Sequence, residues 1–255
     1  MIAHEVRYFL IALQFLTRVG IKPIDPFPDD WLPRSAKYMP LVGALIGAAV
    51  GFVLLISSAV FPAPVAIVIS LTVSILLTGA LHEDGLADTA DAFGGGASPE
   101  RRLEIMKDSR IGTYGALALI AVLALKATSL AAIGPVSVVG VLIAAYAGAR
   151  LAAVLTLAFL PYAGGDNVKV SRAPSRMTMV ELTVAIATSL VVGFCVMDTA
   201  VFIAATIVAV VAAAIVALIA RRKIGGYTGD VLGAIEQVYE AAFLAFAAAM
   251  IAGAG

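Results

Sequence analysis

Long stretches without charged residues alternate with short polar segments along this chain, and the pattern predicts membrane-spanning helices. No charged residue occurs in 38–81, which is long enough for two spans of about 20 residues each, divided at Pro62 to Pro64. The other apolar stretches are 113–160, broken at Gly134 and Pro135, then 182–197, 199–220 and a last one that ends at the C-terminus. We therefore expect an all-α polytopic membrane protein with about seven transmembrane helices, arranged as three hairpins and a closing helix.

The N-terminal segment predicts an amphipathic helix at the membrane interface. Its apolar run, 8–16, is short for a span, and no small-residue cleavage pattern of a signal peptide follows it. Arg7, Gln14 and Arg18 fall on one narrow stripe of a helix, with apolar residues around the rest. Such a helix lies in the plane of the interface.

Composition supports a membrane protein and excludes two other classes. The chain of 255 residues is 62% hydrophobic and only 13% charged, whereas soluble domains are about 45–50% apolar and about 25% charged. A soluble globule and a disordered chain are both excluded, and we expect residues 1–255 to form a single membrane-embedded catalytic domain. The net charge of zero gives no reason to expect a nucleic-acid partner.

The positive charges orient the predicted spans. Of the 17 Lys and Arg residues, all but Lys126 and Arg150 lie in the N-terminal segment or in three polar loops. By the positive-inside rule these segments face the cytoplasm, and we expect a multi-pass protein of the bacterial inner membrane. Because the polar chemistry gathers at that face and not along a path through the midplane, an enzyme is favoured over a transporter.

The most informative polar segment, 82–91, directly follows a predicted span. On a helix Asp84, Asp88 and Asp91 share an arc of roughly 60°, and no basic residue occurs in 82–100. Three like charges on one face repel, so a divalent cation is expected, and hard oxygen ligands suit Mg²⁺. Glu83, on another side of the helix, is a candidate ligand or cap. His82 is a candidate general base, or else caps a span or bonds a carboxylate.

The following residues add phosphate-binding chemistry. Three glycines expose backbone amides or simply form a flexible loop, and Ser98 with Pro99 predicts a helix start. Arg150, inside a span, either reaches the phosphates or pairs with a buried acid, and Lys126 either snorkels outward or pairs likewise. Asp166, Lys169 and Arg172 are further loop candidates. The candidates for substrate or phosphate binding are Gly94, Gly95, Gly96, Arg101, Arg102, Lys107, Asp108, Arg110, Arg150 and Thr228. Carboxylates, a cation and arginines together indicate a phosphate or diphosphate ester as substrate.

Four motifs resemble the cobalamin synthase family, the membrane-bound adenosylcobinamide-GDP ribazoletransferases. They are LQFLTR at 13–18, HEDGLADTAD at 82–91, ERRLEIMKDSRIGT at 100–113 and GGYTGDVLGA at 225–234, and they span most of the chain. Ala92 departs from the family pattern, where glycine is common.

The resemblance implies a Mg²⁺-dependent reaction. Adenosylcobinamide-GDP and α-ribazole, or α-ribazole 5′-phosphate, would give adenosylcobalamin, or its 5′-phosphate, and GMP. Asp84, Asp88 and Asp91 would hold Mg²⁺ against the diphosphate, and Asp230 would be a further ligand or a general base. Other enzymes of the same pathway are expected partners, and a homo-oligomer is compatible with the sequence.

Two rival functions fit parts of the pattern. A CDP-alcohol phosphotransferase also uses grouped aspartates and Mg²⁺, but its motif begins D-G-x-x-A-R, whereas Asp84 and Gly85 are followed here by Leu86, Ala87 and Asp88. Release of CMP instead of GMP would indicate that rival. A transporter or pathway scaffold would act without cleaving a bond.

Overall fold

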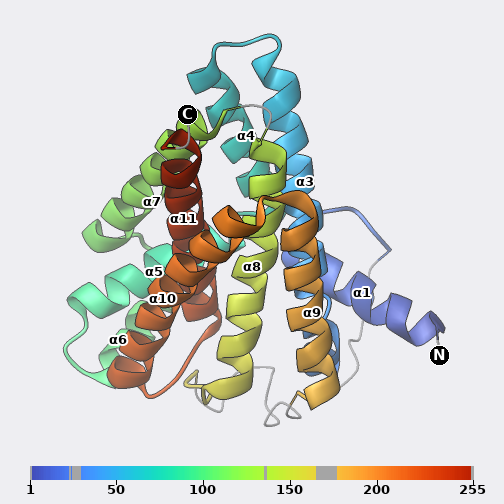
Figure 1. Cartoon of the computed structure of the whole chain (residues 1–255). Coiled ribbons are helices and arrows are strands. Elements are labelled where there is room, and N and C mark those ends of the chain that lie inside the picture. The colour runs from blue at the N-terminus through green and yellow to red at the C-terminus, as the bar shows by residue number, and fades with distance from the viewer. Residues whose placement is uncertain (1, 23, 25–29, 135–136, 165–176, 254–255) are drawn as a thin grey trace.

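The computed structural model describes residues 2–22, 24, 30–134, 137–164 and 177–253, which fold into helices (Figure 1). The helices are α1 (Ile2–Leu16), α2 (Trp31–Ala36), α3 (Met39–Ser58), α4 (Ala63–Thr78), α5 (Leu81–Gly95), α6 (Pro99–Ile105), α7 (Thr113–Ile133), α8 (Val138–Phe159), α9 (Met179–Val196), α10 (Thr199–Ile224) and α11 (Gly229–Ala252). The predicted all-α polytopic class is confirmed. Outside helices, the described residues form one isolated bridge, between Tyr162 and Tyr227.

Within the described residues, six helices are long and apolar enough to cross a membrane: α3, α7, α8, α9, α10 and α11. The seventh predicted span corresponds to α4, which has 16 residues and is followed after two residues by α5 at an angle of 89°. The turn contains Gly79 and Ala80, both with positive φ, of 69° and 60°. The acidic segment therefore does not continue the span, as its sequence position suggested, but runs across it.

Three helices form the centre of the bundle. α3 carries Gly43, Gly47 and Gly51 at four-residue spacing, and a Cβ at each would meet the backbone of α8. Small residues at this spacing let two membrane helices approach closely, so α3 and α8 pack along most of their length. α11 packs against α5, α7, α8 and α10, and its middle is buried.

The outer helices expose their apolar side chains. Ile120 of α7, Val191 of α9 and Ile207 of α10 are about 60% exposed, at 65%, 61% and 59%. Apolar surface of this extent marks a surface that is covered in its native setting, and a lipid bilayer fits helices of this length.

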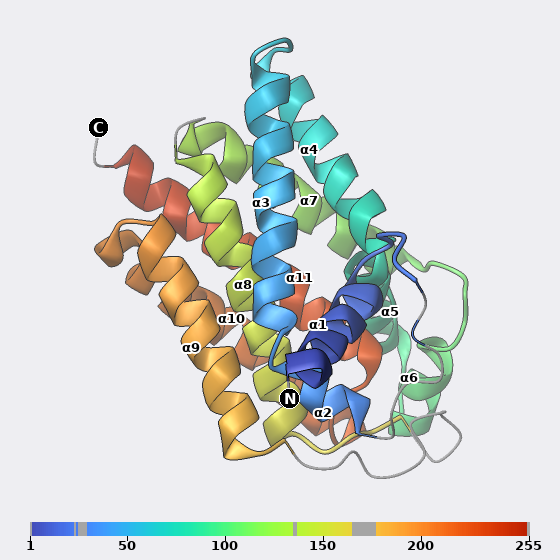
Figure 2. The same cartoon turned by 90° about the vertical axis from the view of Figure 1, so that its right-hand side faces the viewer.

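α1 packs against α2 and α3 near the end of the bundle that holds α6 (Figure 2). Ile11, Ala12 and Leu16 are buried against the protein, whereas Arg7 and Arg18 are exposed. The predicted amphipathic helix is present, and its apolar face covers the bundle. Its position relative to a membrane stays a prediction.

Candidate active site

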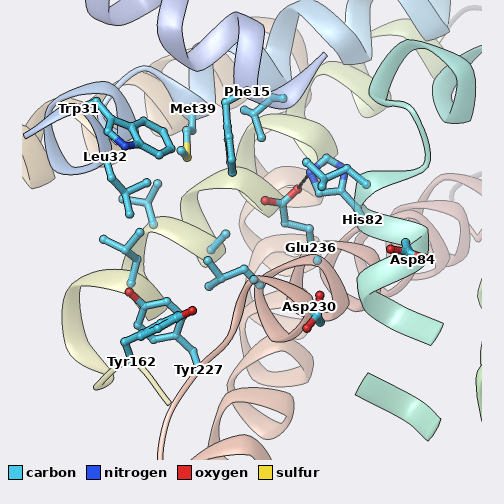
Figure 3. Close-up of a pocket in the computed structure, with 18 residues that line it drawn as sticks. Phe15, Trp31, Leu32, Met39, His82, Asp84, Tyr162, Tyr227, Asp230 and Glu236 are labelled. Carbon is cyan, nitrogen blue, oxygen red and sulfur yellow. Dashed lines mark ion pairs between the residues drawn. The ribbon is translucent and has the colours of Figure 1, made fainter. Parts of the chain in front are cut away.

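A cavity of about 290 Å³ opens between α1, α2, α3, α5, α8 and α11 (Figure 3). Its walls are mainly apolar and aromatic, and they include Phe15, Trp31, Tyr162 and Tyr227. Asp84 of α5 and Asp230 of α11 lie together on another side of the cavity, near His82 and Glu236. The cavity thus combines an apolar wall with an acidic rim, and we call the latter the acidic end.

Four aspartates from two helices gather around this acidic end. Burial and the neighbouring charges of Asp84, Asp230 and Asp91 raise the pKa of Asp88 to about 7. Asp88 lies on α5, which runs across the bundle and does not span it. The predicted convergence of Asp84, Asp88 and Asp230 is therefore observed, and their mutual repulsion is the kind that a bound cation relieves.

Asp91 has a second role that the sequence did not indicate. Its Oδ2 accepts a hydrogen bond of 2.7 Å from the amide of Gly112, and its Oδ1 accepts one of 2.9 Å from Gly115. Gly112 is the N-cap of α7 and Gly115 lies in its first turn, where backbone donors lack helical partners. The carboxylate thus caps α7, and its part in metal binding stays a prediction.

Close contact between α5 and α11 brings the aspartates together. A Cβ on Gly85 would lie 2.7 Å from the carbonyl oxygen and 2.9 Å from the Cα of Asp230. A Cβ on Gly233 would lie 3.1 Å from the backbone of His82. Because these are backbone atoms, they cannot move aside as a flexible side chain would, and a Cβ on Gly85 would force the two helices apart.

Gly85→Ala is expected to lower catalytic activity by about 100-fold, because a shift of about 1 Å in a reacting group has effects of that size. Alanine favours a helix over glycine by roughly 1 kcal/mol, so without the contact the substitution would stabilise the protein. The measurement is kcat with the melting temperature in detergent. Gly20→Ala is the control, since a Cβ there meets nothing within 4 Å; unchanged kcat in Gly85→Ala would contradict the proposed contact.

Beside the acidic end, buried charged side chains connect α5, α8 and α11. Nε2 of His82 lies 2.9 Å from Oε2 of Glu236, and Nδ1 lies 3.4 Å from Nη2 of Arg150. Arg150 is only 1% exposed; its Nε lies 3.2 Å from Oε2 of Glu236, and it also forms an ion pair with Glu240. Arg150 therefore pairs with buried acids, the second of its two predicted roles, and it does not line the cavity.

Lys126 and Glu83 join the same network from α7 and α5. Lys126 donates hydrogen bonds of 2.6 Å to Gln237 and to Glu240, so it does not snorkel outward. Gln237 donates to Glu83 at 3.0 Å. Glu83 thus points into the bundle, on a different side of α5 from Asp84, and its role as a metal ligand stays a prediction.

The predicted phosphate-binding cations lie on and after α6, which packs against α5 and α10. Arg101 pairs with Glu104 at 2.9 Å, Arg110 pairs with Asp108 at 2.6 Å, and Arg102 donates to the carbonyl of Lys223 at 3.0 Å. Lys107 is exposed. These side chains are near the C-terminal half of α5 but outside the cavity wall, and their contact with phosphate stays a prediction.

Of the glycines after the aspartates, Gly94 and Gly96 serve close packing. Gly94 and Gly95 belong to α5, and Gly96 ends it, so the expected flexible loop is wrong at this point. A Cβ on Gly94 would meet the ring of Tyr114 at 2.5 Å. Ser98 accepts a hydrogen bond from Arg101 at 3.2 Å, which confirms the predicted helix start. Thr228 caps α11 by accepting from Val231 at 3.3 Å. Asp166, Lys169 and Arg172 lie outside the described residues.

The acidic end fits a magnesium ion shared with a substrate. Among the residues that the structure describes, no three His, Cys, Asp or Glu side chains are grouped so as to hold a metal alone. Mg²⁺ usually takes one or two carboxylates, substrate phosphates and water. The hard carboxylate oxygens of Asp84 and Asp88 match that donor set, and a cation would relieve the repulsion that raises the pKa of Asp88.

Glu236, Glu240 and the aromatic wall were not predicted from the sequence. The glutamates are four residues apart in the last apolar stretch, and pairing them with Lys126 and Arg150, the two cations inside spans, was the available signal. Trp31, Tyr162 and Tyr227 are far apart in the sequence, and no spacing pattern connects them.

Comparison with known proteins gives one consistent result. A family model described as cobalamin-5-phosphate synthase matches residues 8–248. A protein of Leptothrix cholodnii named adenosylcobinamide-GDP ribazoletransferase is 41% identical over 255 residues, covering 96% of each chain. Proteins of the same name from Shewanella amazonensis and Shewanella frigidimarina are 39% and 36% identical, and each alignment covers 92% of both chains. No solved structure matches this chain.

Proposed function

This chain belongs to the cobalamin-5-phosphate synthase family, and from that premise we propose that the acidic end of the cavity is where its reaction takes place. The enzyme is a transferase of cobalamin synthesis that acts on adenosylcobinamide-GDP and a ribazole. The observation that carries the placement is the meeting of Asp84, Asp88 and Asp230 beside a mainly apolar cavity. In the reaction a ribazole hydroxyl forms a bond to the phosphorus on the cobinamide arm, and the bond from that phosphorus to GMP breaks.

Asp84 and Asp88 would hold Mg²⁺ against the diphosphate. When bound, the ion would neutralise charge on the diphosphate oxygens. The two carboxylates repel an anionic substrate unless a cation balances their negative charge. The neighbouring aspartates make the ionised form of Asp88 unfavourable even without a substrate, because they help to raise its pKa.

Asp230 is the better candidate to accept the hydroxyl proton. It lines the cavity at the start of α11. Nε2 of His82 faces Glu236, and Nδ1 faces the guanidinium of Arg150. Since both ring nitrogens face buried charged groups, His82 would orient the network and leave proton transfer to a carboxylate.

The cations on and after α6 would receive the leaving nucleotide. Arg101, Arg102, Lys107 and Arg110 follow the acidic helix directly, and guanidinium groups bind phosphate oxygens in pairs. The present partners of the three arginines are wholly or partly exposed acids or a backbone carbonyl, which a phosphate can replace at low cost. By the positive-inside rule this end of the protein faces the cytoplasm of a bacterial cell.

Purified protein in detergent is expected to release GMP from adenosylcobinamide-GDP only when both a ribazole and Mg²⁺ are present. Chelation should stop the release, and added Mg²⁺ should restore it, because the diphosphate otherwise meets uncompensated carboxylates. The measurement is chromatographic separation of GMP and the corrinoid product, with α-ribazole and α-ribazole 5′-phosphate compared. Full turnover in chelator would contradict the metal assignment, and release of CMP from a CDP-alcohol would contradict the reaction.

A further inference from the structure

The wall opposite the acidic end is built from aromatic and apolar side chains of segments distant in the sequence (Figure 3). Trp31 and Phe15 contact each other with ring centroids 5.3 Å apart, and Tyr162 and Tyr227 do so at 5.5 Å. The backbones of the tyrosines are also joined, since Ala163 donates to the carbonyl of Tyr227 at 2.8 Å. The aromatic wall is therefore fixed by backbone pairing as well as by packing.

Three chemical parts of the reacting molecules compete for this cavity. A corrinoid ring with its side chains is too large, because pockets for drug-sized ligands begin at roughly 300 Å³ and this cavity has about 290 Å³. Guanine carries several donors and acceptors on its edge, and these lose free energy when they are buried without partners. The base of a ribazole is a flat, largely hydrocarbon benzimidazole without an edge of that kind.

We propose that the aromatic wall binds the benzimidazole of the ribazole, with the ribose directed toward Asp230. This assignment rests on the proposed function. Flat heterocycles gain binding energy by stacking on aromatic side chains. Asp84 and Asp230 lie across the cavity from that wall, so the same orientation places a ribose hydroxyl beside the carboxylate that would take its proton. The diphosphate of the other substrate then approaches from the acidic end.

Binding of the base has a direct optical readout. The chain has a single tryptophan, Trp31, and it lines the cavity. Titration of the purified protein with α-ribazole, without Mg²⁺ and without the corrinoid, is expected to give a saturable change in fluorescence. Guanosine should give no comparable change. Because the corrinoid and the metal are left out, this readout does not depend on turnover.

The kinetic test separates the two substrates. Tyr162→Ala is expected to raise KM for α-ribazole about tenfold, the effect of losing one stacked base contact, and to leave KM for adenosylcobinamide-GDP within twofold. Tyr162 is 38% exposed, so its truncation does not empty the core. Phe159→Ala is the control, since its side chain is 70% exposed at the end of α8 and lies outside the cavity wall.

Other outcomes would overturn the assignment. An increase in KM for adenosylcobinamide-GDP alone would show that the cavity binds that substrate and not the ribazole. If α-ribazole does not bind and both KM values are unchanged, the cavity does not recognise either substrate. Quenching of Trp31 by brominated phospholipid that α-ribazole does not displace would show a lipid chain there. In each case wild-type protein would still release GMP, whereas failure of the proposed function would abolish that release.

Discussion

Asp88→Asn is expected to reduce transfer at least 100-fold and, without Mg²⁺, to raise the melting temperature. Loss of one group that balances charge in a transition state lowers turnover by roughly that factor. The gain in stability has the opposite sign because burial and three neighbouring aspartates raise the pKa of Asp88 to about 7. Its ionised form is therefore unfavourable in the folded protein, and asparagine removes that cost. We expect the melting temperature to rise by roughly 2 °C, which corresponds to a gain in unfolding free energy of at most about 1 kcal/mol.

The pH dependence follows from the direction of the shift. Because the folded pKa exceeds the unfolded value, the destabilisation by Asp88 begins above the unfolded value, near 3.8, and is complete only above pH 7. The stability difference between the variant and wild type should thus be larger at pH 8 than at pH 5. Mg²⁺ should raise the melting temperature of wild type and reverse the order, because a ligand stabilises the state that binds it.

Asp198→Asn is the matched control for Asp88→Asn. Asp198 accepts a hydrogen bond of 2.9 Å from Ala200 at the start of α10 and lies outside the cavity wall. Asparagine caps a helix about as well as aspartate, so kcat and the melting temperature of Asp198→Asn should equal those of the wild type. A less stable Asp88→Asn protein in chelator would show that Asp88 has a structural partner, and the proposed repulsion would then be wrong.

Hydropathy located the spans because lipid offers no partner to backbone groups, so each crossing segment must be a continuous apolar helix. The predicted breaks at Pro62 to Pro64 and at Asp198 indeed lie at the ends of α4 and α10. The hydropathy pattern did not predict the sharp bend between α4 and α5. It depends on the positive φ of Ala80, 60°. Alanine rarely adopts this left-handed conformation, so the sequence gives no sign of it.

Among the candidate site residues, spacing predicted what lies on one helix and missed what two helices bring together. Asp84 and Asp88 share a face of α5 because of helical geometry alone. Their contact with Asp230 needs the close approach at Gly85, and the capping of α7 by Asp91 needs the α6–α7 connection to return along α5. Such contacts depend on tertiary packing, which local periodicity does not encode.

The largest effect on stability is expected for Lys126→Met, which should destabilise the protein by about 3–5 kcal/mol, the usual loss when one partner of a buried ion pair is removed. Lys126 and Glu240 are 2% and 1% exposed, and their ion pair of 2.6 Å joins α7 to α11. Glu240→Gln should also destabilise the protein, because it leaves Lys126 and Arg150 with fewer acids. The measurement is unfolding in mixed micelles with increasing SDS.

The double variant Lys126→Met with Glu240→Gln distinguishes pairing from packing. If the network requires balanced charge, its destabilisation should be smaller than the sum of the single losses by at least 1 kcal/mol, as for residues in one network. The exposed pair of Arg101 and Glu104 is the control cycle, since both side chains are more than 60% exposed, at 63% and 64%, and such pairs couple by about 0–1 kcal/mol. Additive losses at the buried pair would mean that the side chains act through their volume alone. The charges of this pair would then not be what holds α7 against α11.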